Sequence, residues 1–378
     1  MPLNRKYRFL YLTKARKIVL KLGTKVLLSH HQDINTERID KLVDDIVSFK
    51  EKGYKFYIVT SGAVGLGMNR LGVETRPTDL KKIQALASIG QCLLMDKWND
   101  TFQKKGLHVG QILLTHDIFQ NRNRFLHARD CLGAMTEYGT VPVINENDSV
   151  AVDELKFGDN DMLSALTASL IDADLLVLFT DTDGVFTKNP KKYPDAVRIR
   201  LIEEVNDDVF KMIEDKQNPF SLGGMTSKLK AARLAAEGGT GVVITDGMHA
   251  RLKSLLEGED IGTFIKPNLK YRKEKKKWIF FNQQIKGKIV IDAGAEDALV
   301  NHLRSLLPGG IVRTDGDFDE GAIVGIFNPD DVMIGKGITH YSSEDIERIK
   351  GQRTDDIRKE IDKRFYEEVI HRDNMIIL

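Results

Sequence analysis

The chain has 378 residues, enough for two domains, and its 42% hydrophobic and 29% charged residues are typical of a soluble globular protein. Its formal net charge is +1, and no stretch approaches the roughly 18 uninterrupted apolar residues of a membrane span. The basic segment 1–14 has no signal-peptide core and no small-residue cleavage site. We therefore interpret it as a surface extension, expect no membrane contact, and expect a cytoplasmic protein.

Strands and helices alternate over the first two thirds of the chain. Short apolar runs predict strands at 17–22, 55–60, 109–115, 141–145, 174–180 and 241–245. Helices are predicted at 39–47, 83–94, 125–138, 162–170 and 229–237. Because the strands are continuously apolar rather than alternating, both of their faces are buried. This predicts an α/β domain with a mainly parallel sheet sandwiched by helices.

The pattern changes after a basic run. Residues 270–277 hold six basic side chains and one acidic one, which we interpret as a solvated linker rather than a nucleic-acid patch. Short strands then follow at 287–292, 310–314, 322–327 and 332–335, with one helix at 295–307. They predict a second, small β-rich domain, a barrel. The predicted borders are 15–268 for the α/β domain, 269–284 for the linker and 285–363 for the β-rich domain.

The two cysteines and nine histidines carry no metal signature. Cys92 and Cys131 lie in helical patterns without a C-x-x-C partner, and His30 and His31 lack metal-ligand spacing. We expect thiols in the core and imidazoles at the surface, and no zinc site.

Polar side chains cluster after the strand at 141–144 and before the helix at 162–170. Asn145 to Asp148 follow the end of that strand, where open parallel sheets bind ligands, and Asp159 to Asp161 precede the helix. Helix capping or turn closure explains one or two such residues, but not both clusters. They predict a functional site.

Three glycine-containing turns could hold phosphate oxygens: 21–24 and 60–67 after strands, and 222–228 before a helix. None of them is a Walker A sequence or a dinucleotide-binding fingerprint. Two of the turns carry a lysine, Lys21 and Lys228. Lysines of this kind neutralise charge as it spreads over a transferring phosphoryl group, so together with the acidic clusters they predict phosphoryl transfer.

Five motifs in order carry a family resemblance: Val19-Leu-Lys-Leu-Gly-Thr24, Val59-Thr-Ser-Gly-Ala63, Pro142-Val-Ile-Asn-Glu-Asn-Asp148, Phe157-Gly-Asp-Asn-Asp161 and Gly223-Gly-Met225 with Lys228. With them the chain resembles the glutamate 5-kinases of the amino-acid kinase superfamily, and its C-terminal part resembles a PUA domain. The resemblance implies transfer of the γ-phosphoryl group of ATP to the side-chain carboxylate of L-glutamate, the first step of proline biosynthesis. It also implies Mg²⁺, a homo-oligomer, commonly a tetramer, and feedback inhibition by proline.

The resemblance also implies roles for individual residues. Lys21 and Lys228 would flank the transferring phosphoryl group, and Asp161 would hold their ammonium groups. Glutamate would be bound by Ser61, Asp148 and Asn160. The nucleotide would be bound by Lys21, Gly62, Thr180, Asp181, Leu222, Gly223, Gly224, Met225, Thr226, Ser227 and Lys228. Leu222 departs from the family, which usually has a small polar residue there, and this removes a hydroxyl from the nucleotide loop.

Two alternatives stay open. A PUA domain suggests RNA, but residues 285–378 hold 13 Lys and Arg against 19 Asp and Glu, so we expect no RNA binding. Another superfamily member acting on acetylglutamate, aspartate or a nucleoside monophosphate would use the same fold. The acidic clusters favour a free amino acid, whose ammonium group they match. Its carboxylate, with a pKa of about 4.3, is ionised at neutral pH, so the reaction needs no general base.

Overall fold

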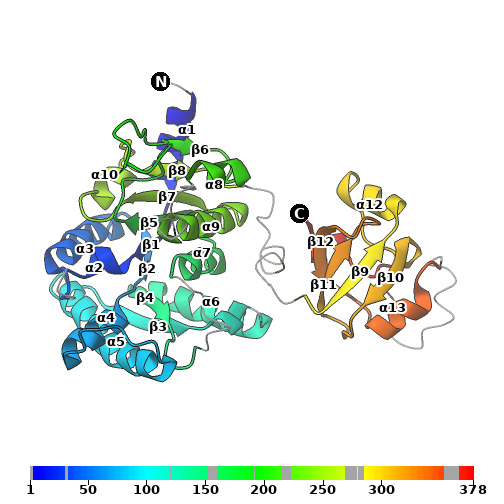
Figure 1. Cartoon of the computed structure of the whole chain (residues 1–378), viewed down its shortest axis with the longest axis horizontal. Helices are drawn as coiled ribbons and strands as arrows, with labels where there is room; N and C mark the ends of the chain where they lie inside the picture. The colour runs from blue at the N-terminus through cyan, green and yellow to red at the C-terminus, as the bar shows by residue number, and fades with distance from the viewer. Residues whose placement is uncertain are drawn as a thin grey trace. The chain divides into compact units, whose positions relative to one another are not determined.

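The structure is a computed structural model that describes residues 3–29, 33–119, 121–151, 160–190, 192–213, 223–268, 279, 285–352 and 366–378. The chain forms two compact units, residues 1–270 and 271–378 (Figure 1). Within the ranges that the structure describes, no helix is both long and apolar enough to cross a membrane.

The first unit is built on an eight-stranded sheet in the order β3-β4-β2-β1-β5-β7-β8-β6. The strands are β1 (Lys17–Leu22), β2 (Lys55–Val59), β3 (Val109–Leu114), β4 (Val141–Glu146), β5 (Leu175–Thr180), β6 (Leu201–Ile202), β7 (Gly241–Asp246) and β8 (Thr263–Ile265). The strands from β3 to β7 in this order are parallel, whereas β8 is antiparallel to β7 and parallel to β6. The mainly parallel sheet predicted from the apolar runs is confirmed.

Helices cover both faces of this sheet, as its doubly apolar strands require. They are α1 (Leu3–Lys14), α2 (Thr24–Leu27), α3 (Thr36–Lys50), α4 (Ala63–Leu71), α5 (Leu80–Gln103), α6 (Arg122–Glu137), α7 (Asn160–Leu170), α8 (Asp207–Ile213), α9 (Gly223–Glu237) and α10 (Leu252–Leu256). Figure 1 shows α3 and α10 on one face and α7 and α9 on the other. Nearly every residue of α7 is buried, because it lies between the sheet and α9.

One face of the N-terminal helix α1 packs into the first unit, so the interpretation of this segment as a surface extension was wrong. Leu12 on α1 is 0% exposed and Arg8 is 5% exposed. The rings of Tyr7 and Tyr11 lie 6.4 Å and 5.3 Å from the ring of Phe264 on β8. The basic residues of this segment masked its apolar stripe in the sequence. The stripe can be recognised only from its contact with β8, which lies far along the chain.

Helices α4 and α5 touch along their backbones. A Cβ on Gly90 would lie 1.8 Å from the carbonyl oxygen of Ala63, and a Cβ on Gly67 would lie 2.0 Å from that of Leu86. Only glycine fits at such a close approach of backbones. The contact fixes the start of α4, where the turn after β2 reaches the carboxyl edge of the sheet.

Several elements of this unit differ from the prediction, among them α9, β6 and β8. The helix predicted at 229–237 begins at Gly223, so Lys228 lies on a helix rather than in a loop. Strands β6 and β8 were not predicted, because two or three residues are too few to show a hydrophobic period.

The second unit holds a five-stranded sheet in the order β10-β9-β11-β12-β13. Its strands are β9 (Gly287–Ile291), β10 (Ile311–Asp315), β11 (Ile323–Phe327), β12 (Met333–Ile338) and β13 (Met375–Ile377). Its apolar core includes Ile289, Val324 and Ile346. The second, β-rich domain is confirmed. The linker, except Ile279, and residues 353–365 lie outside the described residues.

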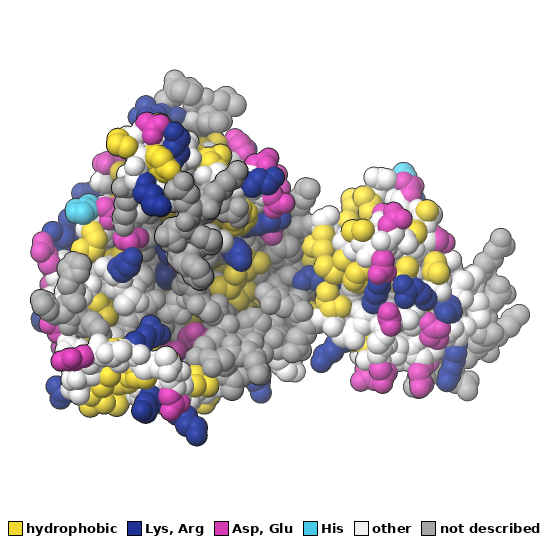
Figure 2. Space-filling model, in the orientation of Figure 1, with side chains coloured by type: hydrophobic (Ala, Val, Ile, Leu, Met, Phe, Trp, Pro, Cys, Tyr) yellow, Lys and Arg dark blue, Asp and Glu magenta, His cyan; other side chains and the backbone are white. Residues whose placement is uncertain are grey.

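The helices of this unit also differ from the prediction. The helix predicted at 295–307 is α12 (Ala293–Val300), and a second helix, α13 (Ser343–Ile349), was not predicted. Lys288 and Arg313 both pair with Asp331, and Figure 2 shows basic side chains among acidic ones on the visible face.

The two cysteines lie on helices, as predicted, but their side chains are exposed rather than buried. Cys92 on α5 and Cys131 on α6 are free and exposed, so the expectation of core thiols was wrong. Each thiol lies on the exposed side of its helix.

Candidate active site

A buried carboxylate shared by two lysines lies at the carboxyl edge of the first sheet. Lys21 Nζ is 2.5 Å from Asp161 Oδ1, and Lys228 Nζ is 3.0 Å from Asp161 Oδ2. Asp161 is 0% exposed, and the side chains of Lys21 and Lys228 are 4% and 13% exposed. Ammonium groups held out of bulk water at this edge suit an anionic ligand.

Each member of this triad comes from a different element. Lys21 is the fifth residue of β1, the strand between β2 and β5. Asp161 lies in the first turn of α7, where the helix dipole favours a carboxylate. Lys228 lies in the second turn of α9 and also donates to the carbonyl oxygen of Gly224 at 3.2 Å. Residues 140 positions apart along the chain meet because the parallel strands end at one edge.

A chain of amide hydrogen bonds lies beside the triad. Asn160 Nδ2 is 2.6 Å from the carbonyl oxygen of Thr60, 3.0 Å from Ser61 Oγ and 2.9 Å from Asn145 Oδ1. Asn145 in turn donates to Gln91 Oε1 at 2.8 Å. These bonds join the ends of β2 and β4 to α7 and α5. They hold Ser61 and Asn160 in one arrangement before any ligand binds.

Two cavities meet at this edge. The smaller cavity has a volume of about 430 Å³ and is lined by Lys21 and Lys228. The larger cavity has a volume of about 1150 Å³ and is lined by Asp148 and Asn160. Among the residues that the structure describes, four line both: Thr24, Lys25, Ser61 and Asp181. Ligands in the two cavities would therefore meet along this shared wall, within reach of the lysines.

The smaller cavity suits a nucleotide with its phosphates. Its volume lies within the roughly 300–1,000 Å³ typical of ligand pockets. One wall is the first turn of α9, whose backbone N–H groups have no partner within the helix and attract anions. Another is the segment that follows β5, which adds Phe186 and Lys188.

The predicted nucleotide residues divide between the two cavities and the helix. Those that line the smaller cavity are Lys21, Thr180, Asp181, Gly224, Met225 and Lys228. Gly223, Thr226 and Ser227 lie in the first turns of α9, and Leu222 lies outside the described residues. Gly62 lines the larger cavity, where its φ of +99° ends the turn before α4, a conformation that favours glycine.

The larger cavity carries groups of both charges. Its acidic side chains are Glu74, Glu146, Asp148 and Asp181, its basic ones are Lys25 and Arg76, and its amides are Asn35, Asn145 and Asn160. The predicted glutamate-binding residues Ser61, Asp148 and Asn160 all line it. The carboxylates suit the ammonium group of a free amino acid, and Lys25 and Arg76 suit its carboxylates. Asp159, the other acidic residue before α7, lies outside the described residues.

Sequence reasoning did not assign a role to three residues that the structure adds to this edge. Gln91 extends the amide chain from Asn145, and Lys25 pairs with Asp181 at 3.0 Å in the shared wall. Arg76 brings a second cation to the larger cavity. Lys25 follows the turn at 21–24 directly, which was a usable signal, whereas Gln91 and Arg76 carry none.

Comparison with known proteins agrees with this geometry. Residues 16–246, more than half of the chain, match the sequence profile of the amino acid kinase family. The chain belongs to the amino acid kinase family. Residues 287–361 of this amino acid kinase match the PUA domain.

Its relatives match along nearly the whole length. A protein of Moorella thermoacetica named glutamate 5-kinase is 42% identical over 370 residues, which cover 98% of each chain. One of Caldanaerobacter subterraneus, also named glutamate 5-kinase, is 42% identical over 96% of this chain and 98% of its own. Among solved structures, the carbamate kinase from Giardia lamblia bound to AMP-PNP is 16% identical, with a TM-score of 0.49 over 68% of this chain and 100% of its own.

Proposed function

We propose that the chain is a glutamate 5-kinase, which transfers the γ-phosphoryl group of ATP to the side-chain carboxylate of L-glutamate in the first step of proline biosynthesis. The observation that carries the proposal is the buried triad of Lys21, Asp161 and Lys228 beside the wall shared by the two cavities. The 42% identity to a glutamate 5-kinase over 98% of both chains supports the choice of acceptor.

The reaction requires two anions to meet, and the lysines supply the opposing charge. One oxygen of the glutamate side-chain carboxylate attacks the γ-phosphorus, and the bond from that phosphorus to the β–γ bridging oxygen breaks. The electron pair leaves with ADP, and no proton has to move because the carboxylate is already ionised. Lys21 and Lys228 stabilise the charge on the transferring oxygens, and Asp161 keeps both ammonium groups oriented.

The larger cavity would hold glutamate. Asp148 provides a carboxylate for the ammonium group of the amino acid. Asn160 donates to Ser61 Oγ at 3.0 Å and so holds this hydroxyl group in the shared wall. The hydroxyl group can in turn donate to the reacting carboxylate of glutamate. Because both cavities lie within residues 15–268, we assign the chemistry to that range.

The residues present fit Mg²⁺ as a companion of the nucleotide rather than as a resident ion. Mg²⁺ is usually held by one or two carboxylates together with substrate phosphates. No group of three His, Cys, Asp or Glu side chains in the described ranges could cage a metal alone. Asp181, which lines both cavities, would hold the ion against the phosphates. When bound, Mg²⁺ supplies charge neutralisation on the β- and γ-phosphates.

A panel of acceptors tests the proposal. ADP release is followed with ATP and Mg²⁺ and, in turn, L-glutamate, N-acetyl-L-glutamate, L-aspartate or UMP. We expect L-glutamate to give the highest kcat/KM, with the acyl phosphate trapped by hydroxylamine. Preference for any other acceptor would refute the assignment while leaving the kinase family intact.

Three properties that accompany this activity in the family are part of the proposal: a homo-tetramer, inhibition by proline and a cytoplasmic location. Proline shares the α-carboxylate and ammonium groups of glutamate, so the mixed charges of the larger cavity suit it as well. Light scattering of the purified chain and glutamate titrations with and without proline test the first two.

A further inference from the structure

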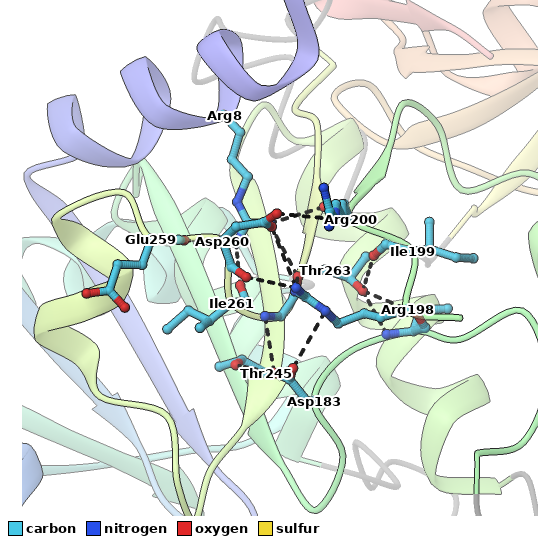
Figure 3. A network of polar contacts seen from close by, with 12 residues as sticks. Arg8, Asp183, Arg198, Ile199, Arg200, Thr245, Glu259, Asp260, Ile261 and Thr263 are labelled. Atoms are coloured by element: carbon cyan, nitrogen blue, oxygen red, sulfur yellow. Dashed lines mark hydrogen bonds and ion pairs between the residues drawn. The ribbon is translucent and has the colours of Figure 1, made fainter. Parts of the chain in front are cut away.

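A buried arginine of the N-terminal helix binds a turn at the far end of the first unit. Arg8, 5% exposed on α1, donates to the carbonyl oxygens of Glu259, Ile261 and Gly262 and to Asp260 Oδ1 at 2.9 Å (Figure 3). The planar fork of a guanidinium group suits several acceptors at once, which a lysine does not match. One side chain thus holds almost the whole turn before β8.

The same turn is held on both sides by close packing. A Cβ on Gly258 would lie 2.3 Å from Cδ2 of Phe9, the neighbour of Arg8 on α1. Gly262 has a φ of +68°, and a Cβ there would lie 2.4 Å from the carbonyl oxygen of Ile244 on β7. The turn is therefore fixed between α1 and the sheet, and it cannot shift without moving one of them.

Arg198 carries the connection from this turn toward the smaller cavity. Like Arg8, it donates to the carbonyl oxygen of Gly262, and its Nη2 is 2.8 Å from the carbonyl oxygen of Asp260. Its Nε lies 3.6 Å from Asp183 Oδ2. Asp183 also accepts from the backbone N–H of Gly262 at 3.2 Å, and Figure 3 shows it facing this network.

The segment after β5 is attached to this network at two more points. Phe186 forms an antiparallel bridge with Arg198, and the backbone N–H of Val185 donates to Thr263 Oγ1 at 2.8 Å. A Cβ on Gly184 would lie 2.5 Å from the same Oγ1. Thr182, Gly184, Phe186 and Lys188 of this segment line the smaller cavity. The wall of the nucleotide cavity is therefore attached, through Arg198 and Thr263, to the turn that Arg8 holds.

We propose that Arg8 is a positioning residue for the nucleotide: through the turn 258–262 it fixes the segment 182–188 that walls the smaller cavity. The inference rests on the proposed function, which puts ATP in that cavity. Arg8 itself does not line either cavity, so it touches neither substrate. Loss of Arg8 loosens the nucleotide wall and leaves the lysine triad and the larger cavity in place.

Steady-state kinetics of Arg8→Gln test this, with Arg5→Gln, at an exposed position of the same helix, as the matched control. We expect KM for ATP to rise about tenfold, while kcat at saturating ATP and KM for glutamate stay within about twofold. Arg8→Lys should recover only part of the affinity. Unchanged KM for ATP in folded Arg8→Gln, or an equal rise in both KM values, overturns the inference.

Two additions make every outcome decisive. Titration of each variant with a fluorescent ATP analogue measures nucleotide affinity even if glutamate is not the acceptor, which separates failure of this inference from failure of the proposed function. If Arg8→Gln does not fold, Asp183→Asn removes the link at the other end of the network. A folded Asp183→Asn protein with normal nucleotide affinity refutes the inference.

Discussion

The first unit contains two clusters in which cations share a carboxylate, and their surroundings differ. In the lysine triad, Lys21 and Lys228 meet Asp161 and both line the smaller cavity. In the arginine cluster, Arg8, Arg198 and Arg200 surround Asp260, and Arg8 also donates to four backbone carbonyl oxygens.

The comparison distinguishes charged groups that stabilise the fold from charged groups that bind a ligand. Burial lowers the pKa of Arg8, and Asp260 counteracts that shift, so the carbonyl dipoles and this carboxylate stabilise the charge within the protein. Lys21 and Lys228 line a cavity, where their ammonium groups can bind the phosphates of a ligand. Guanidinium groups suit the first task because of their fork, and compact ammonium groups suit the second.

The largest effect should follow from removing a lysine of the triad. We expect Lys228→Ala and Lys21→Ala each to lower kcat by about 10²–10³-fold with a smaller change in KM, because their charge acts mainly in the transition state. Steady-state assays with ATP and L-glutamate measure this. Lys230→Ala, at an exposed position of the same helix as Lys228, is the control and should keep normal kcat. Normal turnover of a well-folded Lys228→Ala protein would contradict the mechanism.

Changes in the larger cavity should act on the acceptor alone. We expect Asp148→Asn and Asn160→Ala to raise KM for glutamate tens-fold, since losing one partner of a charged contact costs about 2–5 kcal/mol. Sensitivity to proline should fall in parallel, and KM for ATP should stay near normal. If KM for glutamate changed less than about twofold in both variants, the acceptor would bind elsewhere.

Both clusters lie before residue 269, so removing the second unit should have a modest effect on catalysis. A chain ending at Asn268 should fold and keep kcat within about threefold, with changes in assembly or regulation, because interfaces between such domains are usually small and polar. Sedimentation and the glutamate assay test this. A soluble, monodisperse and inactive fragment would show that the second unit shapes the active site.

The smallest effect concerns a buried cation of the second unit. Burial lowers the pKa of Lys336 on β12 to about 8 from its ordinary 10.5. As the pH rises, Lys336 therefore loses its proton at a lower pH in the folded unit than in the unfolded chain. The destabilisation is full below about pH 8, declines as the pH rises, and is gone above the ordinary pKa.

Lys336→Met should accordingly raise the unfolding temperature of this unit at pH 7, by about 5 °C for each kcal/mol regained, and much less near pH 10. Calorimetry at both pH values measures the difference, with Lys286→Met at an exposed position as the control. An equal gain at both pH values would show that packing, not charge, is responsible.

The sequence could predict those features that depend on residues close together in the chain, but not those that depend on contacts between distant residues. The strand at 17–22 was predicted to the residue because an unbroken apolar run indicates a buried parallel strand. The start of α9 was missed because Gly223 and Gly224 disfavour a helix interior, although a first turn tolerates them. Arg8 looked like a solvated charge because its acceptors lie about 250 residues away. Gln91 was missed because its role depends on how α5 packs against its neighbours.

The contact between α1 and the turn before β8 has a consequence for synthesis. Arg8 and Asp260 are 252 residues apart, so α1 is synthesised long before the turn that it contacts. At about 5–20 residues per second, translation leaves the apolar stripe of α1 uncovered for on the order of ten seconds or more. The nascent chain therefore presents Tyr7, Tyr11 and Leu12 to chaperones until Phe264 leaves the ribosome and the unit closes.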